Sequence, residues 1–288
     1  MKYQFILDNS DTFPVGKMSA TLDVHRSSYY QWLKSTEKRN KKKLEEQNLI
    51  TEIKNIQEKA RYSYGTPRIT NALKNSLFDI NHKKVARILR DNNLNHRIKK
   101  KFKITTDSNH KFNTSPNLLN RNFTAISTNQ KWVSDITYVW TAEGWLYLCV
   151  VLDLFSRKVI GWAVSSRIDT NLLLTAFWHA IELRNPGKGL IFHSDRGIQY
   201  CSARFHKVLK SHGIYQSMSR KGDCWDNACA ETFFKSLKTE WLYDINFNNR
   251  QEAKNVLFEY IEIFYNRQRS HSYLGYKTPE EYELKSVA

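Results

Sequence analysis

Three acidic residues, Asp135, Asp195 and Glu231, have the types and spacing that phosphoryl-transfer chemistry needs. Asp135 lies within a β-rich segment, on the same face as Val133 and Val139, where an unpaired charge is expensive to bury. Asp195 ends the apolar segment GLIFHSD, and Glu231 lies just over one turn into a predicted helix. Converging carboxylates repel one another unless cations lie between them, and oxygen ligands of this kind suit Mg²⁺ or Mn²⁺. The three residues are therefore predicted to hold two such ions, roughly 3.5–4 Å apart, an arrangement that promotes in-line phosphoryl displacement.

The elements that must position these acids follow an order typical of an α/β, ribonuclease-H-like fold. The segments KWVSDITYVW, GWLYLCVVLD and KVIGWAV predict an antiparallel meander of three strands. Two further strands, GLIFHSD and GIYQSMS, alternate with helices, which gives a mixed five-stranded sheet with flanking helices. In that order the first strand and GLIFHSD lie side by side, so Asp135 and Asp195 are neighbours. The final helix of the order, after GIYQSMS, then packs where Glu231 can join them. The catalytic core is assigned to 131–245, and 246–288 to a C-terminal helical extension with a helix over 251–266.

The predicted helix that carries Glu231 places polar groups beside it. Asn227, Lys235 and Lys238 share its face, because they lie one or two turns away along the helix. One interpretation is that this face holds a metal ion and DNA phosphates together. The other is a simple pair of Glu231 with Lys235, worth only tenths of a kcal/mol.

The basic charge of the chain is concentrated in its first part. The chain has a formal net charge of +17, and residues 1–130 hold 25 Lys and Arg against 11 Asp and Glu. Clustered Lys and Arg gain affinity for nucleic acid by displacing its counterions, so the first part is predicted to bind phosphates. A solubilising surface is the alternative.

Helical patterns fill this basic part. Residues 1–36 are predicted to form a helix-turn-helix-like segment, with a charged run over 37–46 that is either a solvated helix face or a linker. Residues 44–104 are predicted to form an all-α, basic three-helix DNA-binding domain, with Thr66 and Asn81 as helix N-caps and Leu77 on the buried face. Its candidate DNA contacts are Lys83, Arg87, Arg90, Lys99, Lys100 and Lys101. An ordinary three-helix bundle is the alternative interpretation.

The segment 105–130 is predicted to be a linker, because 14 of its 26 residues are Ser, Thr or Asn. Leu118, Leu119 and Phe123 are expected to hold part of it against a neighbouring surface.

Composition excludes several classes of protein. The longest uncharged apolar run, Trp145 to Leu152, is far shorter than the roughly 18–20 residues that span a bilayer. The first residues meet an acid too early for a signal peptide. Four cysteines are too few for a disulfide framework and have no zinc-finger spacing, so a cytosolic protein with reduced thiols and no membrane partner is expected. No GxxxxGK[ST] motif is present.

Longer motifs resemble a known family. WVSDITY, VLDLFSRKVIGW, FHSDRGIQY and SMSRKGDCWDNACAETFFKSLKTE are similar to the integrase core of bacterial insertion-sequence transposases, especially OrfB-type proteins. Asp195 and Glu231 are separated by 35 residues, the spacing of the D,D,35,E motif shared with retroviral integrases. The flanking YSYGTPRI, NHKKVARILRDNNL and YNRQRSHSYLGYKTPEEY are similar to the same family. Ser134 and Thr232 are small departures that leave the acidic positions intact.

The resemblance implies DNA strand cleavage followed by strand transfer, with Asp135, Asp195 and Glu231 as the metal ligands. It implies double-stranded DNA as partner (terminal inverted repeats and target), a homo-oligomer on that DNA, and an OrfA-type partner or fusion. Arg196, His193 and Asn227 border the acids and are candidate supporting groups or DNA contacts. Arg269 and His271 are expected either to approach DNA or to close the core. A DNA-binding regulator with an idle core and a ribonuclease-H-like nuclease remain alternatives.

Overall fold

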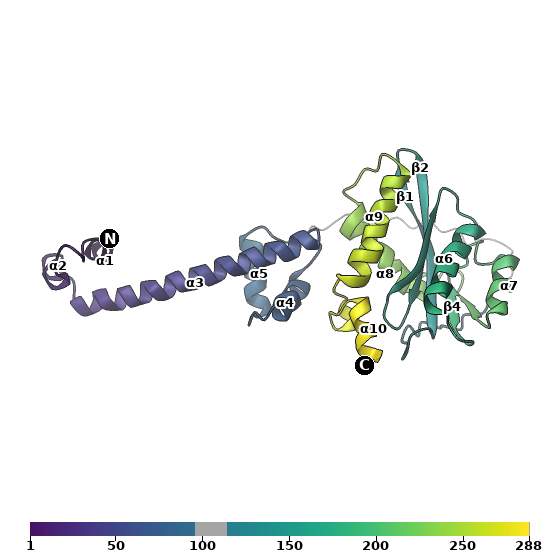
Figure 1. Cartoon of the computed structure of the whole chain (residues 1–288), viewed down its shortest axis with the longest axis horizontal. Coiled ribbons are helices and arrows are strands. Elements are labelled where there is room, and N and C mark those ends of the chain that lie inside the picture. Colours follow the sequence, from purple (N-terminus) through teal and green to yellow (C-terminus); the bar gives the residue numbers. More distant parts are fainter. Residues whose placement is uncertain (96–113, 288) are drawn as a thin grey trace.

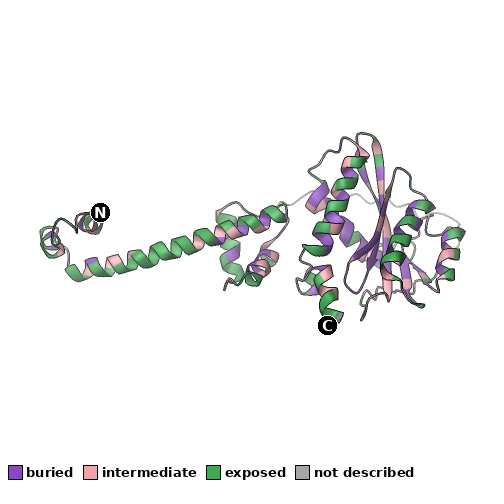
Figure 2. Ribbon diagram, in the orientation of Figure 1, coloured by how far each residue is buried: buried purple, intermediate pink, exposed green. Residues whose placement is uncertain are grey.

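The computed structural model describes residues 1–95 and 114–287 and has an elongated shape (Figure 1). At its N-terminal end α1 (Lys2–Asp8), α2 (Val15–Thr21) and the start of α3 (Arg26–Lys59) enclose a small core of Ile6, Met18 and Tyr29. The charged run 37–46 lies inside α3, which continues without a break across it for 34 residues, or roughly 50 Å at 1.5 Å per residue. The middle of α3 is exposed to solvent (Figure 2), so this run is a solvated helix.

Further along the chain, α4 (Thr66–Asn75) and α5 (His82–Asp91) pack on the end of α3, and their apolar residues join the larger core on one face of the sheet. We call α3's last turns, α4 and α5 the three-helix unit. Asn81 caps α5 as predicted, and its side chain accepts a hydrogen bond from the Lys84 N–H at 2.9 Å. Two predictions here are wrong. Gly65 rather than Thr66 is the N-cap of α4. Leu77 is 94% exposed, because the helix ends before it and the chain turns there with a positive φ.

The five strands form one mixed sheet, as predicted. Its strands are β1 (Lys131–Thr141), β2 (Gly144–Asp153), β3 (Val159–Ser165), β4 (Ile191–Ser194) and β5 (Tyr215–Met218). Their order across the sheet is β3-β2-β1-β4-β5, with β1, β2 and β3 antiparallel in sequence and β4 and β5 parallel to β1. The strand that carries Asp135 is therefore central.

Helices cover both faces of this sheet (Figures 1 and 2). One face packs against α6 (Thr170–Arg184) and α7 (Ala203–Ser211). The other face packs against the short η1 turn (Cys224–Asn227) and the helices that follow it. These are α8 (Ala228–Leu237), η2 (Lys238–Leu242), α9 (Arg250–Phe258) and η3 (Glu259–Tyr265), with η4 (Ser272–Leu274) and α10 (Pro279–Val287) after them.

The segment after residue 245 shares its apolar core with the sheet and with the three-helix unit. The Asn266 side chain pairs with the backbone of Val159 at 3.0 Å, which attaches η3 to β3. The Tyr64 hydroxyl accepts a hydrogen bond from the Ser270 N–H at 2.8 Å, which attaches the three-helix unit to the chain after η3. Among the described helices, none is long and apolar enough to cross a membrane.

Replacing Gly161 on β3 is expected to destabilise the sheet. A Cβ at this position would lie 2.3 Å from the Ala176 carbonyl oxygen and 2.7 Å from the Ala180 nitrogen of α6. Gly161→Ala therefore forces α6 away from the sheet and should cost about 1–3 kcal/mol in the free energy of unfolding by urea. Gly187→Ala is the control, because nothing lies within 4 Å of its added Cβ. Equal stability of the two variants would contradict this close packing.

Candidate active site

The parallel pairing of β1 and β4 places Asp135 and Asp195 side by side. The last paired residues are Val133 and His193; two residues later come Asp135, still on β1, and Asp195, directly after the end of β4. This is the adjacency that the sequence predicted from strand order. The Asp135 carboxylate accepts a hydrogen bond from the Ile136 N–H at 2.8 Å, and the Asp195 carboxylate accepts one from the Gly197 N–H at 2.9 Å.

Glu231 reaches the same end of the sheet from the first turns of α8. Burial raises the pKa of Asp135 well above its ordinary value, and the nearby charges of Asp195 and Glu231 raise it further. Burial also raises the pKa of Glu231, with Asp195 adding to the effect. Each of the three acids therefore acts electrostatically on another, as converging carboxylates must.

The donor set fits a hard divalent cation in its chemistry, because it offers only carboxylate oxygens. Bringing a cation between the acids would relieve the repulsion that raises the pKa of Asp135. Within residues 1–95 and 114–287, however, no three His, Cys, Asp or Glu side chains already stand close enough to hold an ion together. Ion binding would therefore require these side chains to turn toward one another.

Asn227 connects α8 to the central strand. Its side-chain N–H donates to the Ser134 carbonyl oxygen at 3.3 Å, and the residue is 3% exposed. The amide therefore helps to position the helix of Glu231 against β1, and the DNA contact expected of Asn227 stays a prediction. The sequence could not show this, because the face that carries Glu231 turns partly toward β1.

The two lysines on this face differ in their surroundings. Lys235 is exposed, whereas Lys238 is buried, with its ammonium 4.9 Å from the centre of the Tyr138 ring. Burial lowers the pKa of Lys238 to about 8, against the opposite effect of Asp135. Lys238 is thus a cation beside the acids rather than on the outer surface.

The two residues around Asp195 are held by β5 and the loop after it. Arg196 is half-buried, and its Nε donates to the Ser219 carbonyl oxygen at 2.7 Å. His193 is buried between the hydroxyls of Ser217 at 2.8 Å and Ser219 at 3.3 Å, and burial lowers its pKa to about 4. His193 is therefore a neutral group inside the sheet and not a DNA contact.

An ion-pair cluster that the sequence did not single out fixes the loop before α8. Its centre is Asp226, whose carboxylate is buried and accepts hydrogen bonds from Arg220 at 2.8 and 2.9 Å. Arg121 and Asn117, from the predicted linker, each donate to the same carboxylate at 2.9 Å. In that linker Leu119 is buried and Phe123 packs against the core, as expected, whereas Leu118 is exposed. The described part of the linker is therefore attached to the catalytic core.

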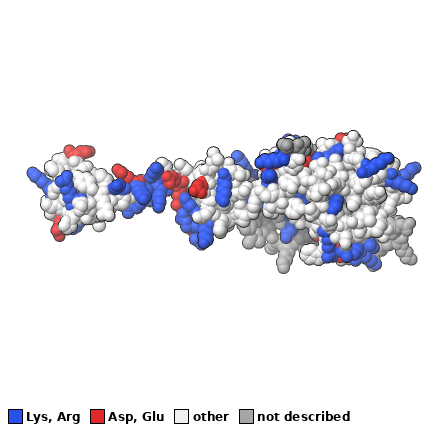
Figure 3. Space-filling model, turned by 90° about the horizontal axis from the view of Figure 1, so that it is seen from below, with Lys and Arg blue, Asp and Glu red and all other residues white. Residues whose placement is uncertain are grey.

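The basic stripe of α5 lies on the surface of the three-helix unit, as predicted. Lys83, Arg87 and Arg90 are all exposed, but Arg87 pairs with Glu46 at 3.0 Å and with Asp91 at 3.7 Å. The predicted contacts Lys99, Lys100 and Lys101 lie outside the described residues. Figure 3 shows Lys and Arg side chains along the extended N-terminal half and over the core on the face in view.

Comparison with known families agrees with this division of the chain. Residues 127–224 and 212–279 match two models of the integrase core domain, and residues 43–102 match an HTH-like domain. The chain is thus an enzyme with an integrase catalytic core, of the polynucleotidyl transferase type.

Full-length relatives define the family. Transposase InsF for insertion sequence IS3A of Escherichia coli K12 is 40% identical over 288 residues, covering 100% of both chains. The 31 kDa protein of insertion element IS600 of Shigella sonnei is 41% identical over 268 residues, covering 93% of this chain and 98% of that one. The chain belongs to the IS3 family of insertion-sequence transposases.

Two solved structures are similar at lower identity. The simian T-cell lymphotropic virus intasome in complex with a PP2A regulatory subunit matches with a TM-score of 0.47 and 17% identity, covering 76% of this chain and 70% of that one. The HTLV-2 integrase catalytic core domain in complex with magnesium matches with a TM-score of 0.43 and 20% identity, covering 56% of this chain and 99% of that one.

Proposed function

We propose that this transposase cleaves DNA strands at insertion-sequence ends and transfers them to target DNA, using Asp135, Asp195 and Glu231 to hold two Mg²⁺ or Mn²⁺ ions. The observation that carries the proposal is the register of β1 and β4. This register makes the two aspartates neighbours, close to the end of α8 that bears Glu231. When bound, such ions supply an activated attacking oxygen and stabilise the charge on the leaving oxygen.

The protein's own groups orient the acids and the phosphate. The sheet fixes the spacing of Asp135 and Asp195, whereas the position of Glu231 depends on how α8 docks through Asn227. Lys238 brings a positive charge beside Asp135, and exposed Lys235 lies one turn beyond Glu231. Both ammonium groups are suited to hold phosphates next to the bond that breaks.

The two chemical steps use different nucleophiles. In the first, water attacks a phosphodiester and leaves a free 3′-hydroxyl on the element's end. In the second, this hydroxyl attacks a phosphodiester of the target, so one P–O bond forms for each that breaks and no covalent link to the enzyme is needed. Holding both reactants in line supplies much of the rate, because it replaces an encounter in solution.

Recognition of the DNA is assigned to the three-helix domain 44–104, joined to the core through 105–130. The candidates for phosphates of the terminal repeats are the exposed residues Lys83, Arg87 and Arg90 of α5, together with the tail residues Lys99, Lys100 and Lys101. Two ends must be held together for transposition, so we propose a homo-oligomer on DNA. An OrfA-type partner, or its fusion to this chain, would add the remaining contacts to the ends.

The test is a strand-transfer assay with a labelled duplex from the sequence flanking the gene, a target plasmid, and Mg²⁺ or Mn²⁺. Wild type should give joined product, whereas Glu231→Gln should give none and bind the duplex equally well. Equal joining by Glu231→Gln would contradict the proposed site. If neither protein joins DNA, both are repeated as OrfA fusions, and failure of the wild-type fusion would overturn the proposed function.

A further inference from the structure

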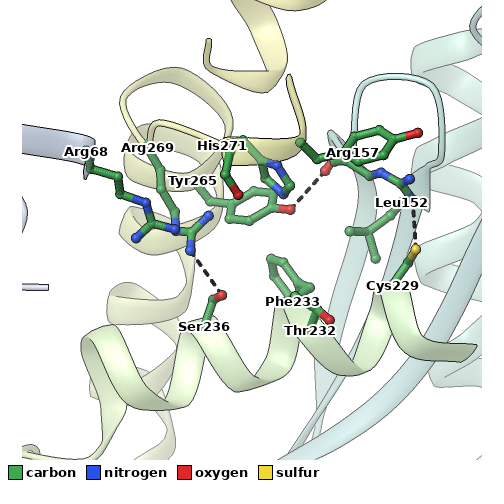
Figure 4. A pocket seen from close by; sticks show the side chains of 12 residues that line it. Arg68, Leu152, Arg157, Cys229, Thr232, Phe233, Ser236, Tyr265, Arg269 and His271 are labelled. Atoms are coloured by element: carbon green, nitrogen blue, oxygen red, sulfur yellow. Dashed lines mark hydrogen bonds between the residues drawn. The ribbon is translucent and has the colours of Figure 1, made fainter. Parts of the chain in front are cut away.

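A pocket of about 270 Å³ lies beside α8, where the three-helix unit and the chain after η3 meet the core (Figure 4). We call it the arginine pocket, because Arg68, Arg157 and Arg269 line it together with His271. Exposed Thr232, the residue after Glu231, is also part of its lining, on a face of α8 turned away from Glu231.

The arginine pocket holds more positive than negative charge. The Arg269 guanidinium makes two hydrogen bonds to the Glu240 carboxylate, both at 2.6 Å, and Arg68 pairs with the same carboxylate at 3.3 Å. Arg157 is 6% exposed and donates to Cys229 Sγ at 2.8 Å and to a backbone carbonyl. In the described part of the chain no carboxylate pairs with Arg157. One carboxylate therefore pairs with two of the three guanidinium groups, and the third, of Arg157, has none.

Such an excess of buried charge is costly unless a counter-ion supplies the missing negative charge. The ring of Tyr273 lies 4.3 Å from the Arg157 guanidinium, but a ring face carries no net charge. The His271 imidazole lies among the three guanidinium groups, and burial together with their charges lowers its pKa to about 3. His271 is thus neutral at physiological pH, and its Nδ1 is buried without a hydrogen-bond partner within the described residues.

We propose that the arginine pocket binds a backbone phosphate of the DNA on which this transposase acts. Guanidinium groups match the geometry of phosphate oxygens, and the exposed hydroxyls of Thr232 and Ser272 add hydrogen-bond donors at the opening. The inference rests on the chain acting on DNA, and it adds a contact that the three acids do not supply.

The placement of the pocket favours DNA over an acidic peptide or a free anion. Arg68 comes from α4 of the three-helix unit, while Thr232 follows Glu231 on α8, so one phosphate here contacts the DNA-reading part and the catalytic core together. A duplex held by both parts brings a row of phosphates across this junction. The net charge of +17 supports a polyanionic ligand.

Arg157→Gln tests the proposal without any strand chemistry. Binding of a fluorescent duplex is measured by anisotropy at several salt concentrations in the absence of divalent ions. Loss of one phosphate contact should weaken binding about tenfold and make the slope of log K against log[salt] shallower by about 0.9. Arg157→Lys should restore most of the slope. Arg267→Gln is the control, because Arg267 is exposed, pairs with Glu280 and lies outside the pocket. An unchanged slope in Arg157→Gln would overturn the proposal.

Inorganic phosphate distinguishes a DNA site from a small-anion site. At constant ionic strength, phosphate should raise the Tm of wild type more than that of Arg157→Gln and should compete with the duplex for binding. A selective rise for wild type, together with equal DNA binding by both proteins, would identify a small-anion site and overturn the assignment to DNA.

Ser272→Glu provides a test that does not depend on the folding of Arg157→Gln. A carboxylate at the opening should neutralise the buried guanidinium charge, so this variant should have a higher Tm and bind DNA more weakly than wild type. Ser286→Glu adds the same charge on exposed α10, outside the pocket, and should change neither property appreciably. A role confined to stability predicts a higher Tm with unchanged DNA binding, and that result would contradict the proposal. Failure of these binding tests would leave the three-acid chemistry untouched, since Glu231→Gln tests it separately.

Discussion

Asp135→Asn should abolish strand transfer and yet make the metal-free protein more stable. The amide removes a negative ligand of the proposed ions, which contribute several kcal/mol to the displacement, so joining should fall on the order of 10³-fold or more. The same change removes a half-buried charge whose pKa is raised by burial and by Asp195 and Glu231. Without divalent ions, the free energy of unfolding should rise by about 1 kcal/mol.

The two effects are separated by measuring joining and thermal unfolding on the same preparations. Added Mg²⁺ should raise the Tm of wild type, because an ion that binds only the folded state stabilises it, and this rise should be absent in Asp135→Asn. Asp79→Asn, an identical change at an exposed position in the three-helix unit, should alter neither measurement. A less stable Asp135→Asn with the same Mg²⁺ response as wild type would show that Asp135 serves the fold rather than the ions.

The sheet and its acidic end were predictable because each depends on local patterns and on a simple rule of connection. Alternating apolar segments indicated β1, β2 and β3, and the order of elements then required β4 beside β1. That adjacency brings Asp135 next to Asp195 without any knowledge of packing. The continuity of α3 was less predictable, since a run of charged residues is equally compatible with a helix and a linker.

Roles that depend on burial could not be predicted from position alone. His193 and Asn227 border the acids in sequence, yet His193 lies within the sheet and Asn227 lies against β1. Arg269 was expected either to approach DNA or to close the core. It is 4% exposed and pairs with Glu240, yet it also lines the arginine pocket. One arginine can therefore hold the core together and still contribute charge to a site.

Clusters assembled from distant segments were missed altogether. Asp226 draws its partners from Arg121 and Arg220, and the arginine pocket combines Arg68, Arg157 and Arg269. Apart from Arg269, each of these residues looks like an ordinary surface charge in its own segment. Only the folded structure shows that Arg121 and Arg220 share the carboxylate of Asp226, and that Arg157 has no carboxylate partner among the described residues.

Replacing Asp226 should damage stability more than replacing any nearby acid. Its carboxylate is fully buried, while Arg220 and Arg121 are about half exposed and can regain water when it is lost. Asp226→Asn should therefore lower the free energy of unfolding in urea by about 2–3 kcal/mol. This lies between the values for breaking an exposed and a fully buried ion pair. Asp223→Asn is the matched control and should cost less, because both arginines keep Asp226 as partner.

The pH dependence of this difference identifies its cause. Hydrogen bonds from Arg220 above all, and those from Arg121, hold the pKa of Asp226 well below its ordinary value of 3.8. A carboxyl whose pKa is lower in the folded state binds fewer protons there, so its stabilisation is complete above pH 3.8 and is lost as the pH falls toward the folded pKa. The gap between wild type and Asp226→Asn should hold from pH 7 to about 5, then shrink by about 1.4 kcal/mol per pH unit below 3.8. A gap that stays constant down to pH 3 would mean that packing, and not the charge of Asp226, holds the loop before α8 in place.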